Sequence, residues 1–345
     1  MKQMEKSFIS RLFSPVDVGI DLGTSSLRIF LKNRGIVLRE PSVAAVDRST
    51  GKVGAIGSRA LALEGKKGWD VVWPLQHGVI AEFDEAQRLL EAALGRVVGR
   101  NLFFKPRVML CVPTGVTGVE RRAVTEAALM AGAAKTYLAE EPVAAALGAG
   151  IHITEPRGHL VVNIGSGTTS AAVLSLGKII CAASLRQGGG AFNEVIVRHL
   201  QRTLNFGVTF AQAEALKQTL GTLNPLGQRG SQIVQGKDAI TGLPTSLRLT
   251  GQDLAKALGE PLHDLVVCLR TLLEKTPPEL CADILEEGIV LTGGGALLNG
   301  LADALAKQMR MRTVVASQPE DCVAMGAGMA LEDSELLEIM TDKRG

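Results

Sequence analysis

The chain has 345 residues, of which 46% are hydrophobic, 21% are charged and only 3% are aromatic. This composition indicates a globular core of aliphatic residues and excludes a disordered or low-complexity chain. The length predicts two domains or one two-lobed body. The 37 basic and 35 acidic residues leave a net charge of +2, which is not typical of a nucleic-acid-binding protein.

The cysteines, histidines and apolar runs exclude several further classes of protein. The five cysteines form no C-x-x-C pair, which favours reduced structural thiols in a cytosolic protein. The five histidines include no H-E-x-x-H motif, which disfavours a zinc hydrolase. No apolar run approaches the ~18 residues of a membrane-spanning helix, and the N-terminus lacks the core of a signal peptide.

Residues 1–14 have the pattern of a short basic amphipathic helix. Lys2, Lys6 and Arg11 outnumber Glu5, and the apolar residues Met1, Met4, Phe8, Ile9, Leu12 and Phe13 occupy a broad half of a helical wheel. Such a helix can lie in the interface of a bilayer. A disordered tail, or a helix that docks on its own domain, is the alternative.

Two segments read as hairpins with glycine-containing tips. Residues 16–26 form an apolar run that breaks into a tight turn, and Leu27–Leu31 resumes as a strand. His159–Asn163 and Ala171–Leu176 repeat this plan around the turn at 165–170. The spacing from residue 21 to residue 163 predicts two similar halves.

The remaining segments alternate between strands and helices, which predicts an α/β fold. Short strands and loops are expected over 33–75, and a polar β-hairpin over 222–252. Further strands are expected at Arg107–Val112 and Gly288–Thr292. The expected helices are Asp84–Val98 with Asp84 as its N-cap, Gly118–Ala131, Pro142–Gly150, Val195–Leu204, Ala211–Leu220, Asp253–Glu274, Ala296–Met309 and Cys322–Leu331.

Three glycine-rich turns follow expected strands, at residues 21–24, 163–169 and 292–295. Glycine lets backbone N–H groups approach phosphate oxygens, and Ser or Thr hydroxyls add donors. The helix expected after the third turn would add its N-terminal dipole. Together the turns favour a nucleotide site over purely structural turns. The chain has neither the spacing of a P-loop nor a G-x-G-x-x-G after its first strand.

Two glutamates, Glu140 and Glu141, precede Pro142 at the start of a helix of small apolar residues. A carboxylate in this position can accept a proton from an attacking water or orient it. The alternative is the ordinary preference of glutamate for a helix N-terminus.

Seven motifs in this order resemble the MreB family, the bacterial actin homologues that form cytoskeletal filaments during rod-shape maintenance. The resemblance runs in register from about residue 16 to residue 332. Its motifs are Asp21-Leu-Gly-Thr24, Val112-Pro-Thr-Gly115, Glu120-Arg-Arg-Ala123, Glu140-Glu-Pro142, Gly165-Ser-Gly-Thr-Thr169, Arg186-Gln-Gly-Gly189 and Thr292-Gly-Gly-Gly295.

The resemblance implies an actin-like ATPase fold of the α/β class, with two lobes around a nucleotide cleft. Each lobe would have an RNase H-like core and a smaller inserted subdomain. Lobe I would comprise residues 15–153 and 321–345, with an insertion at about 33–75. Lobe II would comprise residues 154–320, with an insertion at about 187–250.

The resemblance also implies ATP and Mg²⁺ as ligands. Asp21 would stand near the metal and hold it through water. Glu141 and Thr168 would hold the hydrolytic water as the catalytic residues. Nucleotide-binding positions carried over from the family are Asp21, Gly23, Thr24, Ser25, Asn163, Gly165, Ser166, Gly167, Thr168, Gly189, Glu214, Lys217, Gly293, Gly294 and Gly295.

The second turn departs from the family pattern. Asn163 stands where the family has Asp, Ser166 replaces a glycine, Ser170 replaces an acidic residue, and Gly190 replaces an Asp. Hard cations prefer charged oxygen ligands, so fewer carboxylates should weaken the organisation of Mg²⁺. We therefore expect nucleotide binding with slow hydrolysis; the alternative is that Asp21 and waters suffice.

Leu102, Phe103 and Phe104, flanked by basic residues, are similar to the apolar loop that MreB-like proteins press into the bilayer. A contact within the protein core is the alternative. With the N-terminal segment, this loop predicts peripheral association with the cytoplasmic face of the cell membrane.

The leading hypothesis is a membrane-associated filament protein that binds ATP and organises cell-wall synthesis. By family resemblance its partners would be further copies of itself, MreC, MreD and RodZ, with no nucleic acid. The alternatives are a small-metabolite kinase of the same superfamily and a nucleotide-gated regulator that does not polymerise. The sequence also leaves open whether this is a main MreB or a divergent paralogue.

Overall fold

The computed structural model describes residues 16–99, 105–224 and 230–341. The chain divides into two compact units. Unit 1 comprises Met1–His152 and Asp321–Gly345, and unit 2 comprises Ile153–Glu320. Among the described residues, no helix combines the length and the apolar content needed to cross a bilayer.

Both units contain a five-stranded mixed sheet with the same topology. In unit 1 the strand order is β3 (Gly35–Pro41), β2 (Ser26–Leu31), β1 (Asp17–Leu22), β9 (Arg107–Val112) and β10 (Lys135–Glu140). In unit 2 it is β13 (Lys178–Leu185), β12 (Thr169–Ser175), β11 (His159–Ile164), β17 (Ile289–Thr292) and β18 (Thr313–Val315). The first three strands of each order are antiparallel and the others pair in parallel, so the predicted duplication is confirmed.

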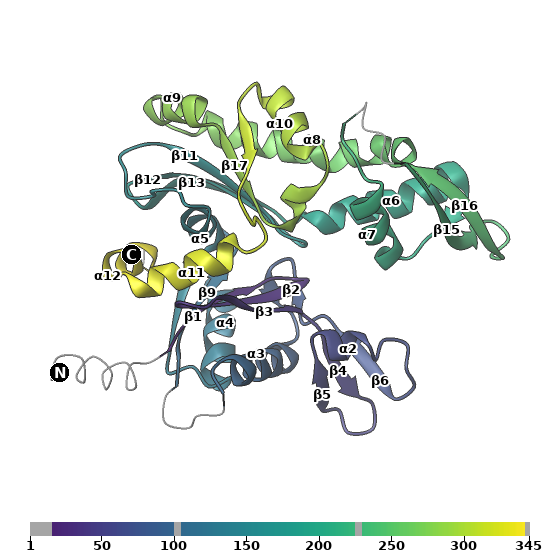
Figure 1. Ribbon diagram of the computed structural model, residues 1–345, viewed down its shortest axis with the longest axis horizontal. Helices are drawn as coiled ribbons and strands as arrows, with labels where there is room; N and C mark the ends of the chain where they lie inside the picture. The colour runs from purple at the N-terminus through teal and green to yellow at the C-terminus, as the bar shows by residue number, and fades with distance from the viewer. Residues whose placement is uncertain (1–15, 100–104, 225–229, 342–345) are drawn as a thin grey trace. The chain divides into compact units, whose positions relative to one another are not determined.

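Helices cover both faces of the sheet of unit 1. Helices α3 (Phe83–Val97) and α4 (Gly118–Met130) lie on one side, and α5 (Glu141–Gly148) and α11 (Cys322–Glu332) on the other (Figure 1). Helices α5 and α11 touch backbone to backbone, because a Cβ added at Gly148 or Gly326 would overlap a carbonyl group of the facing helix. The helix α12 (Ser334–Thr341) ends the described chain.

The sheet of unit 2 has a long helix on one side. Helix α8 (Gly251–Glu274) runs along this sheet, with α9 (Pro278–Glu287) and α10 (Leu301–Met309) beside it (Figure 1). The buried core joins strand residues such as Val162 and Val173 to helix residues such as Leu265 and Leu269. Burying such aliphatic side chains stabilises the fold by roughly 1.5–3 kcal/mol each.

Each unit also carries a small sheet. In unit 1, β5 (Val53–Ile56), β4 (Ala44–Asp47) and β6 (Trp69–Val72) form it, with the short helix α2 (Ser58–Leu61) beside them. The two short strands β7 (Leu75–Gln76) and β8 (Val79–Ile80) follow. In unit 2 the small sheet consists of β14 (Phe206–Gly207), β15 (Ser231–Asp238) and β16 (Pro244–Thr250). Along the chain, β14 lies between the helices α6 (Gly189–Leu204) and α7 (Phe210–Thr219), and β15 and β16 follow α7.

Three local predictions were wrong. The N-cap of α3 is Glu82, and Asp84 lies in the first turn. Helix α6 begins at Gly189, six residues before the predicted start at Val195. The predicted helix over 296–309 is interrupted: a 3₁₀ turn, η1 (Gly294–Leu297), is followed by an extended Leu298 and a left-handed Gly300 before α10 begins.

Candidate functional site

The tip of the β1–β2 hairpin is a two-residue turn formed by Thr24 and Ser25. The amide of Gly23 donates to the carbonyl of Ser26 at 3.1 Å, which closes the turn. The hydroxyl of Ser42 donates to the carbonyl of Gly23 at 2.7 Å. The amide of Gly78 donates to the hydroxyl oxygen of Thr24 at 2.9 Å. The Thr24 hydroxyl is thereby oriented and can donate its own proton to an anion.

Asp21 lies one position before the end of β1, directly opposite Arg28 on β2. Burial raises the pKa of Asp21 to about 6, the charge of Arg28 opposes this rise, and Asp321 adds to it. Arg28 also forms an ion pair with Asp321 at 3.3 Å, and Arg39 forms a second at 2.6 Å. A partly buried carboxylate is therefore held among fixed charges next to the hairpin tip.

Glu141 is the first residue of α5 and is only 7% exposed, whereas Glu140 is the N-cap. Cys111, near the end of β9, lies close enough to Glu141 to be affected by its charge. Burial raises the pKa of the Cys111 thiol well above its usual value, and the charges of Asp21 and Glu141 raise it further. The strand register agrees, because Ile20 pairs with Leu110 and Glu140 pairs with Val112, so Asp21 and Glu141 lie near the same ends of β1, β9 and β10.

The β11–β12 hairpin of unit 2 repeats the design of the first tip. The amide of Gly165 donates to the carbonyl of Thr168 at 2.9 Å, which leaves Ser166 and Gly167 as the turn residues. The first amides of α6 bond to this turn: Gly189 donates to Gly165 at 2.7 Å and Gly190 donates to Ser166 at 2.8 Å. The tip carbonyls thus satisfy N–H groups that a helix start otherwise leaves without partners.

Asn163 occupies in unit 2 the register position that Asp21 occupies in unit 1, and it faces Ser170 across the hairpin. It is 5% exposed, and its Oδ1 accepts a hydrogen bond from the hydroxyl of Thr292 at 3.2 Å. The pair of charges at Asp21 and Arg28 is therefore replaced by two neutral side chains.

The third glycine-rich turn packs against the end of β11. A Cβ added at Gly293 would overlap the carbonyl of Ile164 and lie 2.9 Å from Oδ1 of Asn163. A Cβ added at Gly295 would overlap the side chain of Ile164. The amide of Gly293 donates to Pro319 at 2.7 Å. The prediction that a helix dipole points at this turn is wrong. Only the 3₁₀ turn η1 follows directly, and α10 begins later, at Leu301.

Glu214 and Lys217 lie on α7 and bond to the start of α6. The ammonium of Lys217 donates to Glu214 at 2.9 Å and to the carbonyl of Gly189 at 2.8 Å. Burial alone would raise the pKa of Glu214, but Lys217 and the amide of Asn193 together lower it. Burial lowers the pKa of Lys217, and Glu214 opposes that shift. The predicted pair is thus one hydrogen-bonded unit with Gly189.

Several residues of this arrangement were not predicted, among them Arg28, Arg39, Asn193 and Asp321. Arg39 and Asp321 are 282 positions apart, so no local pattern could join them. Arg28 gave no signal either, because it falls on the less buried phase of the alternation in β2, where a charged residue is ordinary. Asn193 carries no such signal.

The donor set fits a magnesium nucleotide better than a protein-caged metal. In the described part of the chain, no three His, Cys, Asp or Glu side chains gather to hold an ion. Mg²⁺ usually takes one or two carboxylates, phosphate oxygens and waters. Asp21, next to a turn with hydroxyl donors, suits that mode of binding.

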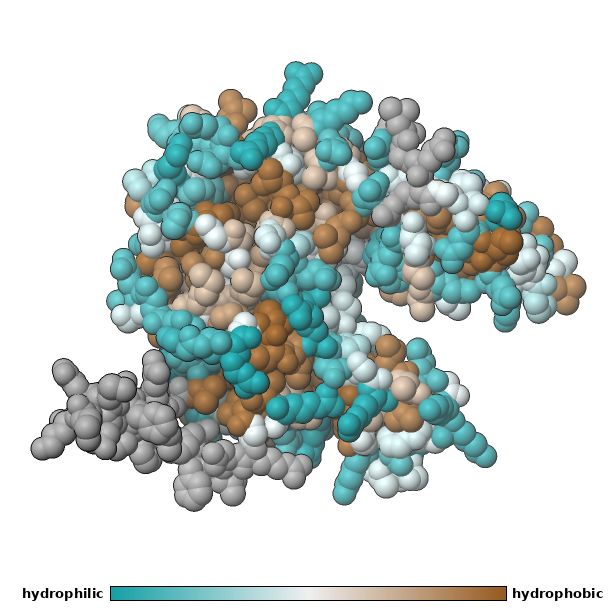
Figure 2. Space-filling view, viewed as in Figure 1, coloured by the Kyte–Doolittle hydropathy of each residue, from teal (hydrophilic) through white to brown (hydrophobic). Residues whose placement is uncertain are grey.

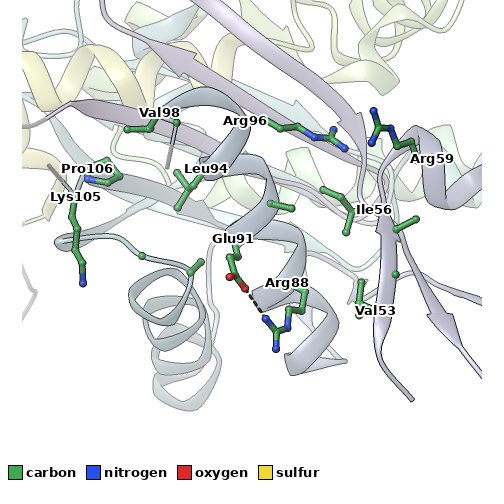
Figure 3. Close-up of a pocket in the computed structure, with 17 residues that line it drawn as sticks. Val53, Ile56, Arg59, Arg88, Glu91, Leu94, Arg96, Val98, Lys105 and Pro106 are labelled. Carbon is green, nitrogen blue, oxygen red and sulfur yellow. Dashed lines mark hydrogen bonds and ion pairs between the residues drawn. The ribbon is translucent and has the colours of Figure 1, made fainter. Parts of the chain in front are cut away.

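Unit 1 also has a hollow away from these residues. It has a volume of about 980 Å³ and is lined by α3, β5 and residues 105–106 and 131–132 (Figure 3). Arg88 bonds to Glu91 at its edge at 2.9 Å, and Arg59 and Arg96 extend toward one another (Figure 3). None of the residues predicted to bind nucleotide lines it.

The predicted membrane contacts Phe8, Leu12, Phe13, Leu102, Phe103 and Phe104 lie outside the described residues. The structure therefore leaves the membrane prediction as it stood.

Comparison with known proteins decides the family. A family model described as MreB/Mbl protein matches residues 15–339. The chain belongs to the MreB/Mbl family. The actin-like fold and the family predicted from the motifs are therefore confirmed.

Curated members of the MreB/Mbl family match almost the whole chain. The cell shape-determining protein Mbl of Bacillus subtilis is 40% identical over 93% of this chain and 97% of its own length. The cell shape-determining protein MreB of Escherichia coli is 41% identical over 92% of this chain and 93% of its own length.

Solved structures agree with the family. MreB 5 of Spiroplasma citri bound to AMPPNP is 32% identical and matches with a TM-score of 0.87, covering 93% of this chain and 97% of its own. A MamK double helical filament is 20% identical with a TM-score of 0.79, covering 93% of this chain and 99% of its own, and it supports the fold alone.

Proposed function

We propose that this chain is an ATP-binding protein that assembles into filaments and takes part in determining cell shape. The observation that carries the proposal is the repeated hairpin tip, in which Gly23 and Gly165 close equivalent two-residue turns. The family membership and the AMPPNP and ADP bound to MreB 5 of Spiroplasma citri support it.

Within the proposed function, each side chain has a separate task. The hydroxyl of Thr24 donates to a phosphate oxygen, since its own oxygen already accepts the amide of Gly78. Asp21 would hold Mg²⁺ through water, and Glu141 would orient the attacking water and accept its proton. Mg²⁺, when bound, supplies positive charge that neutralises the phosphates.

An apolar hairpin supports self-association. Apolar residues gather over β15 and β16 in the space-filling view (Figure 2). The exposed hydrophobic residues of this hairpin are Ile233, Ile240 and Leu243, which are 60%, 76% and 65% exposed. Asp238 holds the turn rigid by accepting the amides of Ile240 and Thr241. Exposed apolar groups on a rigid tip are typical of a contact surface.

Sedimentation with electron microscopy tests the proposed function. We expect the protein to form filaments and pellet with ATP and Mg²⁺, and to pellet far less without nucleotide. The double variant Ile240→Ser, Leu243→Ser should bind ATP normally but pellet less. Nucleotide binding without any assembly would favour the gated regulator, and ATP consumption only with an added small metabolite would favour the kinase.

Hydrolysis is proposed to be slow because Asn163 is neutral. Asn163→Asp restores a carboxylate of the same shape, which can still accept the hydrogen bond from Thr292. We expect steady-state phosphate release to rise severalfold in this variant, because the second carboxylate improves the organisation of Mg²⁺. An unchanged rate would show that Asp21 and waters suffice.

Membrane association rests on the sequence alone. We expect the wild-type protein to float with liposomes, and a variant lacking residues 1–14 and carrying Phe103→Ser and Phe104→Ser to remain in the dense fraction. Undiminished flotation of that variant would refute the assignment. Association with MreC, MreD or RodZ stays a prediction from the family.

A further inference from the structure

An aromatic side chain stands exposed beside the hairpin tip of unit 2. Phe210 is 52% exposed, and among the described residues the only other large aromatic left exposed is Trp73 of unit 1. The end of the Phe210 ring, Cζ, lies 3.6 Å from where a Cβ on Gly190 would stand. Gly190 in turn bonds to Ser166 of the tip. The ring therefore lies against the wall that the tip and the start of α6 form together.

The backbone beneath Phe210 is firmly held. Phe210 is the first residue of α7, and its N-cap Thr209 forms a reciprocal capping box with Gln212. The side chain of Gln212 also donates to the carbonyl of Gln235 on β15 at 2.7 Å. An exposed aromatic ring on a fixed backbone loses little conformational freedom when a ligand covers it.

The face of α7 that carries Phe210 also carries one acidic and one basic side chain. Phe210, Glu214 and Lys217 are spaced i, i+4 and i+7, so they lie on one side of the helix. This face therefore offers an aromatic surface, a carboxylate acceptor and an ammonium donor in sequence. Gly190 has no side chain that could cover the ring.

We propose that Phe210 contacts the nucleoside part of the bound nucleotide by an aromatic stacking contact. The inference rests on the proposed function, since a nucleotide must bind at the tip. Phosphates bound at the Ser166–Gly167 turn leave the base and ribose to extend along the wall. Aromatic side chains stack on bases irrespective of the base's identity, because every base has a flat π-face. Phe210 then distinguishes a nucleotide from a bare polyphosphate.

Calorimetry with two ligands tests this assignment. We expect Phe210→Ala to weaken ATP binding by about tenfold, as loss of one stacking contact does. Binding of inorganic tripolyphosphate with Mg²⁺, which has no base, should be unchanged. Phe210→Trp should retain the affinity for ATP, and Phe210→Leu should lose much of it despite a similar volume. Leu285→Ala, at an exposed apolar residue of α9, serves as the matched control.

The outcomes separate this inference from the proposed function. Wild-type affinity for ATP in Phe210→Ala would overturn the inference and leave the proposed function intact. An equal loss for ATP and tripolyphosphate would also overturn it, because the tip itself would then have changed. A wild-type protein that binds neither ligand would overturn the proposed function and this inference with it.

Discussion

Phosphate release by Glu141→Gln is expected to be slower than in the wild type by about 10²–10⁴-fold, the usual contribution of a general base. Glu141 opens α5 and is only 7% exposed, so its carboxylate is shielded and fixed at the helix start. An amide of the same shape cannot accept the proton of the attacking water. A single-turnover assay with protein in excess over ATP would measure the change even where the wild-type rate is low.

Glu140→Gln is the matched control for this prediction. Glu140 is the preceding residue and has the same charge, but its carboxylate pairs with Arg121 at 3.4 Å. Loss of this charge should leave the rate of phosphate release within about twofold of the wild-type rate, since surface ion pairs contribute little to stability. Equal rates in wild type and Glu141→Gln would remove the catalytic role and leave Glu141 as a residue that merely favours a helix start.

Asp21→Asn should weaken the binding of ATP in the presence of Mg²⁺ by about 10–100-fold, as loss of an outer-shell ligand does. The amide is neutral and cannot orient metal-bound water as a carboxylate does. Asp17→Asn, at the other end of β1, is the control, because Asp17 bonds to Arg107 at 2.7 Å. A comparable loss in both variants would mean that the sheet, and not the carboxylate beside the tip, had been damaged.

The same Asp21→Asn variant should be more stable than the wild type at neutral pH. Burial raises the pKa of Asp21 from 3.8 to about 6, so the folded protein holds this proton more tightly than the unfolded chain does. The stability that this group contributes is present below pH 4 and is lost as the pH rises to 6. The full cost is up to about 3 kcal/mol. Urea unfolding at pH 7.5 would measure the gain, and a less stable variant would contradict it.

The hairpins could be predicted from sequence because their signals are local. An apolar strand, a glycine and a second apolar strand predicted the limits of β2, β11 and β12 to within a residue or two. The repetition of the pattern then predicted the duplicated topology, and the motifs together indicated the family.

The errors arise where contacts distant in sequence decide the local structure. Gly189 and Gly190 precede the predicted helix start at Val195, yet they begin α6 because the carbonyls of Gly165 and Ser166 accept their amides. The left-handed Gly300 and extended Leu298 interrupt a segment whose composition favours a continuous helix. Likewise, no periodicity could assign Asp321 to Arg39, since the pair exists only once α11 has packed on the sheet.

The hydrogen bonds between the β11–β12 tip and α6 also have a mechanical consequence. Both bonds join backbone groups, the amides of Gly189 and Gly190 and the carbonyls of the tip. No side-chain rotation can therefore release the tip from the helix. Lys217 then donates to the carbonyl of Gly189 and so fastens α7 to the start of α6, and Gln212 fastens α7 to β15. A continuous chain of hydrogen bonds therefore joins the turn, through two helices, to the far hairpin, which carries the most exposed aliphatic residues among those described in unit 2.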